Sequence, residues 1–166
     1  MDQDEIQEGI KLCIENAKRL LDDSKLLFDN KRYPASILMS IVSLEESAKA
    51  AKLQEYYHDG RDLTKSQWKR EGFLSHAKKL EKNMKLRGQA IDRKYPSVRG
   101  TYSSDSMAEW FSEEHTKLRE AALYVDRDFE ASVWISPQIH SWLGDDYWAK
   151  YLISAAEESI SIISDS

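Results

Sequence analysis

Apolar residues recur at spacings of three and four along most of the chain, which is the period of a helix with one buried face. The pattern predicts helices over about residues 4–28, 32–58, 73–91, 104–125 and 145–163. Pro34 suits the first turn of the second helix, and Gly60 suits the left-handed position just after its end. Only Asn30 and Lys31 separate the first two helices, so they are expected to pack as an antiparallel hairpin.

No alternating apolar pattern longer than three or four residues appears, so the sequence predicts an all-α fold: one helical bundle of about five helices, forming a single domain over residues 1–166. Residues 61–72 are expected to form a polar connection around Trp68, with at most one helical turn. Residues 93–105 are expected to form a loop, and residues 126–144 irregular structure packed on the bundle. Leu74 is expected within the third helix, and Trp110 on the inner face of the fourth.

The second helix carries charged residues beside its apolar face. Ile37, Leu38, Ile41, Leu44, Ala48 and Ala51 form a wide apolar stripe. Next to this stripe, Glu45 lies four residues and Glu46 three residues before Lys49, so either acid can pair with Lys49. Burying an unpaired acid costs free energy. Two interpretations stay open: a solvated ion pair at the edge of the stripe, or a polar cluster kept in the core for chemistry or recognition.

Charge and composition narrow the class of protein. The 166 residues contain one cysteine, Cys13, which excludes an intramolecular disulfide and is typical of a reducing compartment. There is no apolar run of membrane-spanning length, and the first residues are acidic, so we expect a cytoplasmic protein without a membrane partner. The net charge is −5, yet residues 61–100 hold 12 basic and 4 acidic residues. This basic segment either is a solvated helix face or binds phosphates.

A second group of polar residues surrounds His76. Lys79 lies three residues after His76 on the same predicted helix face, and Arg70 precedes His76 by six positions. Metal-independent RNA cleavage needs a base for the 2′-hydroxyl proton, an acid for the leaving oxygen and cations for the charged intermediate. Arg70, His76, Lys79 and Lys49 could supply these parts, with Glu45 or Glu46 orienting the base.

Other sites are less well supported by the sequence. There is no Cys-x-x-Cys pair, no His-Glu-x-x-His motif and no glycine-rich phosphate loop, so we expect neither a metal nor a cofactor. The end of the fourth helix carries Arg119, Tyr124 and Asp126. Arg119 could reach an acid of the second helix, and Tyr124 could cap the bundle with its hydroxyl.

Four segments in this order resemble the AbiV family of abortive-infection proteins, a branch of the HEPN superfamily of helical domains. They are residues 9–53 with the Glu-Glu-x-x-Lys step, FLSHAKKL at residues 73–80, REAALYVD at residues 119–126, and Pro137 with the closing helix. Together they cover most of the chain. Carried over by position, the resemblance marks Glu45, Glu46, Lys49, His76, Lys79, Arg119, Tyr124 and Asp126.

The resemblance implies a HEPN-like helical bundle that often forms a homodimer and defends bacteria against phage. Proteins of this kind are thought to stop translation or attack RNA, which makes RNA, the translation apparatus and a phage protein the expected partners. Many HEPN proteins cleave RNA without metal, using an Arg-x4–6-His motif. Arg70 and His76 have this spacing, although Glu71 follows Arg70 where Asn, Asp or His is commoner, and Arg70 precedes the third helix rather than starting a late one.

The sequence is therefore consistent with three hypotheses. In the first, His76, Glu46, Lys49 and Arg70 are the catalytic residues of a metal-independent ribonuclease. In the second, the same cluster is structural and the protein is a non-catalytic helical module that binds protein or RNA. In the third, the basic segment makes it a nucleotide-binding or sensor domain. The first requires Glu46, Lys49, His76 and Arg119 to meet in one pocket.

Overall fold

The structure is a computed structural model that describes residues 1–95, 100, 104–123, 126–128, 133–135 and 146–165. In this part of the chain six helices and one short strand pair are present. They are α1 (Gln3–Asp29), α2 (Tyr33–His58), α3 (Lys65–Arg70), α4 (His76–Lys94), α5 (Asp105–Leu123), β1 (Asp126–Asp128), β2 (Val133–Ile135) and α6 (Tyr147–Ser164). The all-α fold class is confirmed, with α3 as the additional helix.

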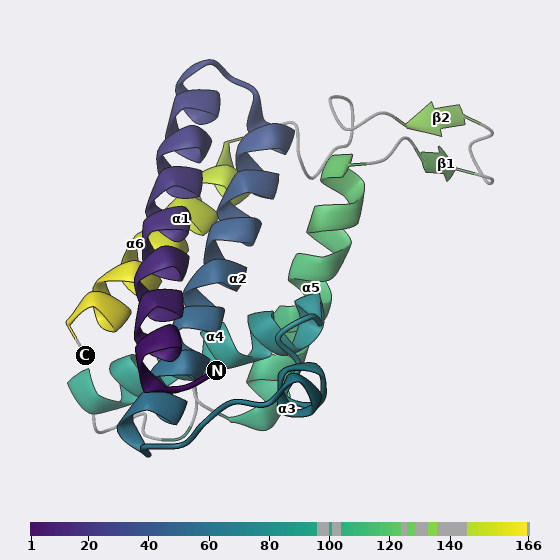
Figure 1. Cartoon of the computed structure of the whole chain (residues 1–166). Coiled ribbons are helices and arrows are strands. Elements are labelled where there is room, and N and C mark those ends of the chain that lie inside the picture. The colour runs from purple at the N-terminus through teal and green to yellow at the C-terminus, as the bar shows by residue number, and fades with distance from the viewer. Residues whose placement is uncertain (96–99, 101–103, 124–125, 129–132, 136–145, 166) are drawn as a thin grey trace.

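The helices α1 and α2 form the expected antiparallel hairpin (Figure 1). Asp2 caps α1 and exchanges hydrogen bonds with Glu5, which satisfies free backbone groups at the helix start. Buried serines line the contact between the two helices: Ser24 Oγ lies 2.9 Å from Ser36 Oγ and 2.7 Å from Ser40 Oγ. These small side chains allow a close approach, and their hydroxyls satisfy one another.

Helix α2 lies at the centre of the bundle. It packs against α1, α4, α5 and α6, whereas α3 lies apart at one end (Figure 1). The largest core cluster joins these five helices, with buried residues Ala17, Leu21, Ile37, Ile41, Leu44, Leu80, Leu118, Ala149, Leu152, Ala155, Ala156 and Ile160. None of the helices described is long and apolar enough to cross a membrane.

A buried amide fixes where α4 crosses α2. The Asn83 side chain is fully buried and donates from Nδ2 to the Leu44 carbonyl oxygen at 3.1 Å. It also accepts from Ser159 Oγ of α6 at 3.2 Å. One side chain of α4 thereby connects the backbone of α2 with the closing helix.

Three local predictions were wrong. Leu74 is exposed because α4 begins only at His76, after the capping residue Ser75. Trp110 is also exposed, since the buried face of α5 passes through Ala108, Phe111 and His115 instead. Within 126–144, where only irregular structure was expected, β1 and β2 pair antiparallel; the rest of that segment is outside the described residues.

Candidate functional site

Glu45 forms the centre of a charged cluster between α2 and α4. Its carboxylate is 2% exposed, and Oε2 accepts hydrogen bonds from Lys79 Nζ at 2.6 Å and from His76 Nδ1 at 2.7 Å. Lys79 is buried as well, whereas the His76 side chain is 48% exposed. The cluster therefore reaches from the protein interior to the surface, with imidazole as its outer member.

The start of α4 places both partners of Glu45. Ser75 caps this helix by accepting from the Lys78 backbone N–H at 3.3 Å, which makes His76 its first residue. Lys79 follows three residues later and so lies on the same face. The Asn83 bond to Leu44 holds this face against the neighbouring Glu45.

This geometry determines which nitrogen of His76 is available. Because Nδ1 contacts a carboxylate oxygen, it carries the proton and donates, so a neutral ring has its lone pair on Nε2. A carboxylate that fixes the tautomer and orientation of a histidine is the arrangement that supports general-base catalysis. Lys79 adds a positive charge next to that base.

Glu46 belongs to a different pair. It bonds to Lys49 across 2.6 Å, and both side chains are largely buried, at 13% and 21% exposure. With about 100° per residue, Lys49 projects between Glu45 and Glu46 on the surface of α2. The Glu46–Lys49 pair is therefore a neighbour of the Glu45–His76–Lys79 cluster. Within the described residues, no hydrogen bond or ion pair joins the pair to the cluster. Burial raises the pKa of the adjacent Cys13 thiol, which keeps it protonated.

The structure separates the two acids of α2. Glu45 belongs to the buried polar cluster, whereas Glu46 does form the expected ion pair with Lys49, but this pair is largely buried rather than solvated. The expected meeting of Glu46 with His76 is wrong, because it is Glu45 that faces α4.

The remaining candidate residues lie away from this cluster. Arg70 is highly exposed at the end of α3, with Nη2 3.7 Å from Glu71 Oε1, and does not contact His76. Arg119 of α5 is half-buried; its Nε has no hydrogen-bond partner and it makes no ion pair to α2 among the residues described. Tyr124 lies outside the described residues. Asp126 is the first residue of β1, where its backbone pairs with Ile135 of β2.

His115 is a buried residue that the sequence analysis missed. It follows Phe111 by four positions and precedes Leu118 by three, so its place on an apolar face was the available signal. Its Nδ1 donates to the Phe111 carbonyl oxygen at 2.6 Å, and its ring lies 3.6 Å from the Phe111 ring. Burial lowers the pKa of His115 from 6.5 to about 4.

Acid is therefore expected to destabilise the protein through His115. In the folded state the ring stays neutral down to about pH 4, whereas an unfolded chain binds the proton near pH 6.5. The folded state thus loses up to about 3 kcal/mol of stability from this group as the pH falls through that window, and keeps it above pH 6.5. Urea unfolding of His115→Phe should show a flatter pH dependence between pH 4 and 6.5 than the wild type or the control His58→Phe. Equal slopes would contradict this assignment.

In the chain as described, no three His, Cys, Asp or Glu side chains are grouped to hold a metal ion. The adjacent acids Glu157 and Glu158 of α6 instead form ion pairs with other helices. Arg87 Nε of α4 donates to Glu158 at 2.8 Å, and Lys25 of α1 pairs with Glu157 at 2.7 Å.

The fold and the cluster define a helical-bundle protein with a buried carboxylate that orients a surface histidine. A family model described as AbiV, of the HEPN type, matches residues 5–160, nearly the whole chain. The chain belongs to this family and is an abortive-infection protein of HEPN type. No curated protein and no solved structure matches it.

Proposed function

We propose that the protein is a metal-independent endoribonuclease that acts in anti-phage defence in the bacterial cytoplasm. Its substrate is cellular RNA, including the RNA of the translation apparatus. The observation that supports this most directly is the hydrogen bond from His76 Nδ1 to the buried Glu45, which leaves the Nε2 lone pair to accept a proton on a side chain that is 48% exposed. A homodimer and activation by a phage protein belong to the same proposal.

In this mechanism His76 Nε2 takes the proton of a ribose 2′-hydroxyl. The 2′-oxygen then attacks phosphorus, the bond from phosphorus to the 5′-oxygen breaks, and that oxygen takes up a proton. The products are a 2′,3′-cyclic phosphate and a 5′-hydroxyl end. Lys79 and Lys49 contribute positive charge near the developing dianion, and Lys49 is the candidate acid for the leaving oxygen. Arg70 is exposed at the end of α3, so its role would be to hold RNA rather than to act on the reacting bond.

A non-catalytic binding module is the second candidate. The burial of Glu45 with Lys79 favours it, because a buried ion pair can serve packing specificity alone. In that case substitutions in the cluster lower activity only as far as they lower stability.

The test uses purified protein, end-labelled tRNA and total cellular RNA in the presence of a chelator. We expect cleavage to persist in chelator and the products to carry 2′,3′-cyclic phosphate ends, because the attacking group in the proposed mechanism is the ribose 2′-oxygen. A parallel cell-free translation reaction shows whether synthesis stops when the RNA is cut. Absence of cleavage, with or without a phage lysate as trigger, contradicts the ribonuclease and leaves the binding module.

A further inference from the structure

A pocket at α3 lies outside the cluster just described. It has a volume of about 320 Å³ and is lined by Met1, Leu63, Thr64, Lys65 and Trp68. This volume is at the small end of the range for ligand sites in proteins. Its lining is largely apolar, with one aromatic side chain and one lysine.

The walls of this pocket are fixed by hydrogen bonds. Met1 N donates to the Leu63 carbonyl oxygen at 2.9 Å, and Leu63 N donates back to the Met1 carbonyl oxygen at 3.0 Å. Gln3 Nε2 also donates to the Arg61 carbonyl oxygen at 2.9 Å. On the other side, Thr64 caps α3 in a reciprocal capping box with Gln67, which sets the direction of the short helix that carries Trp68. The site is thus preformed.

The orientation of the Trp68 indole is fixed by stacking on the buried ring of Phe73. The indole stacks on Phe73 with 4.2 Å between ring centroids and 8° between the planes, and Phe73 is almost fully buried. Phe73 covers one face of the indole, while Trp68 stays partly exposed and lines the pocket. A rigid aromatic face next to a small apolar pocket is suited to stack a flat heterocycle.

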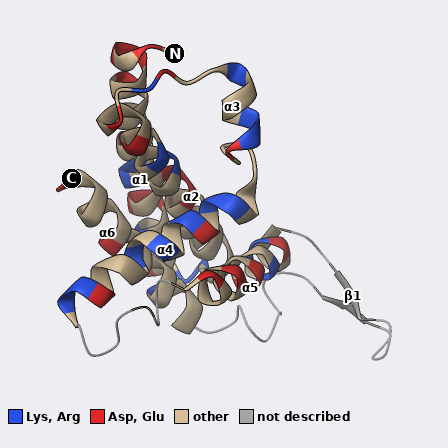
Figure 2. Cartoon of the chain, turned by 90° about the horizontal axis from the view of Figure 1, so that it is seen from below, with Lys and Arg blue, Asp and Glu red and all other residues tan. Residues whose placement is uncertain are grey.

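The rim of the pocket is basic. Lys65 and Lys69 are exposed and form no ion pair with any residue in the described ranges, and Arg70 has only the 3.7 Å approach to Glu71. Figure 2 shows basic residues in blue on α3 and more of them along α4. Cations without acidic partners beside an aromatic face match a base that is attached to phosphates.

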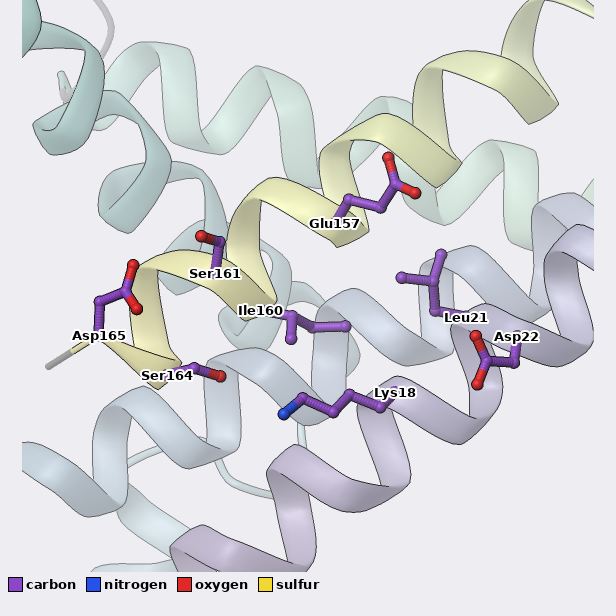
Figure 3. Close-up of a pocket in the computed structure, with 8 residues that line it drawn as sticks. All are labelled: Lys18, Leu21, Asp22, Glu157, Ile160, Ser161, Ser164 and Asp165. Atoms are coloured by element: carbon purple, nitrogen blue, oxygen red, sulfur yellow. The ribbon is translucent and has the colours of Figure 1, made fainter.

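A larger groove among the described residues offers no comparable match. It lies between α1 and α6, has a volume of about 470 Å³, and combines Lys18 with the carboxylates of Asp22, Glu157 and Asp165 over Leu21 and Ile160 (Figure 3). Its charges are mixed, and Glu157 is already paired with Lys25.

We propose that the α3 pocket binds one unpaired nucleobase of single-stranded RNA by stacking on Trp68, while Lys65, Lys69 and Arg70 hold the flanking phosphates. The inference rests on the proposed function for its choice of RNA. Phe73, which supports Trp68, lies three residues before His76, in the turn that joins α3 to α4. This turn is compact: Gly72, which precedes Phe73, has φ +82°, a Cβ there would clash with the Lys78 side chain, and Ser75 N donates to the Gly72 carbonyl oxygen at 3.0 Å. The base pocket and the Glu45–His76–Lys79 cluster are therefore held in a fixed relation, so the pocket selects which unpaired segment reaches His76.

Binding is measured with fluorescein-labelled 12-nucleotide oligo-A and oligo-U RNA and an RNA duplex of the same length, by fluorescence anisotropy at low salt. All proteins carry His76→Ala to prevent cleavage. We expect Trp68→Ala to weaken single-strand binding about tenfold, Trp68→Phe to retain most of the affinity, and the duplex to bind at least tenfold more weakly. Trp110→Ala, which removes an exposed tryptophan of α5, is the matched control and should change nothing.

Lys65→Ala tests the rim without disturbing the aromatic stack. It should reduce the slope of log Kd against log salt by about one, whereas Lys25→Ala on α1 should not. Equal affinity for single strand and duplex, or binding unchanged by both Trp68→Ala and Lys65→Ala, would overturn the pocket. If Trp68→Ala fails to fold, Lys65→Ala and the duplex comparison decide.

The two proposals fail separately. If the wild-type protein cleaves RNA in chelator but RNA binding does not depend on Trp68, only the proposed base pocket is overturned. Binding that depends on Trp68, without any cleavage by the wild-type protein, overturns the nuclease alone.

Discussion

Replacing His76 by alanine is expected to lower the rate of RNA cleavage by about 10²–10⁴-fold, the usual contribution of a positioned general base. The melting temperature should change little, because the ring is half-exposed and makes one hydrogen bond, to Glu45. Both quantities are measured on the same preparation, by the chelator assay and by thermal unfolding followed with circular dichroism. Phage protection in cells should be lost together with cleavage.

His58→Ala is the matched control for this experiment. His58 is also an exposed histidine at a helix end, but it lies at the C-terminus of α2 and outside the cluster. Its replacement should leave the rate unchanged. Cleavage by His76→Ala within a few-fold of the wild-type rate would remove His76 from the mechanism. A large fall in melting temperature would favour the structural module.

Replacing Glu45 by alanine is expected to lower the free energy of unfolding by about 3–5 kcal/mol. The reason is that Lys79, itself 7% exposed, would keep a buried charge without its counter-ion. Urea unfolding at pH 7 measures the effect. Cleavage should fall as well, because His76 would lose the group that orients its ring.

Two further variants separate charge from packing at this position. The double variant Glu45→Leu, Lys79→Met removes both charges and should recover most of the stability while remaining inactive, since well-packed apolar residues often replace a buried ion pair without loss. Glu46→Ala breaks the largely buried pair with Lys49 and should cost about 1–3 kcal/mol, less than Glu45→Ala, because Lys49 at 21% exposure can reach water. A cost below about 1 kcal/mol for Glu45→Ala would show that Lys79 finds another partner or reaches water.

Helix boundaries could be predicted wherever local chemistry sets them. The expected ends of the first two helices, near residues 4, 28, 32 and 58, lie within one residue of α1 and α2, because Pro34 and the turn after Asp29 act locally. The start of α4 could not be predicted in the same way. Phe73 fits a helical apolar pattern, but it lies in the turn before α4, where its ring stacks on Trp68. The helix starts only at His76, after the capping residue Ser75.

The candidate site was only partly predictable for a tertiary reason. Spacing shows that Glu45 and Glu46 both neighbour Lys49, yet the two acids point about 100° apart around α2. Which of them meets His76 depends on where α4 crosses, and that crossing is fixed by Asn83, whose role has no signature in the local pattern. Likewise, the spacing of Arg70 and His76, with five residues between them, implies no contact, because a helix end and a turn separate the two side chains.

The link from Ser159 through Asn83 to Leu44 has a consequence for biosynthesis. The carbonyl that holds α4 in place belongs to the residue next to Glu45, and the hydroxyl that completes the link belongs to α6, which is synthesised after α2 and α4. A nascent chain that still lacks α6 cannot complete this support. If the cluster cuts RNA, its full support forms only after α6 has been synthesised.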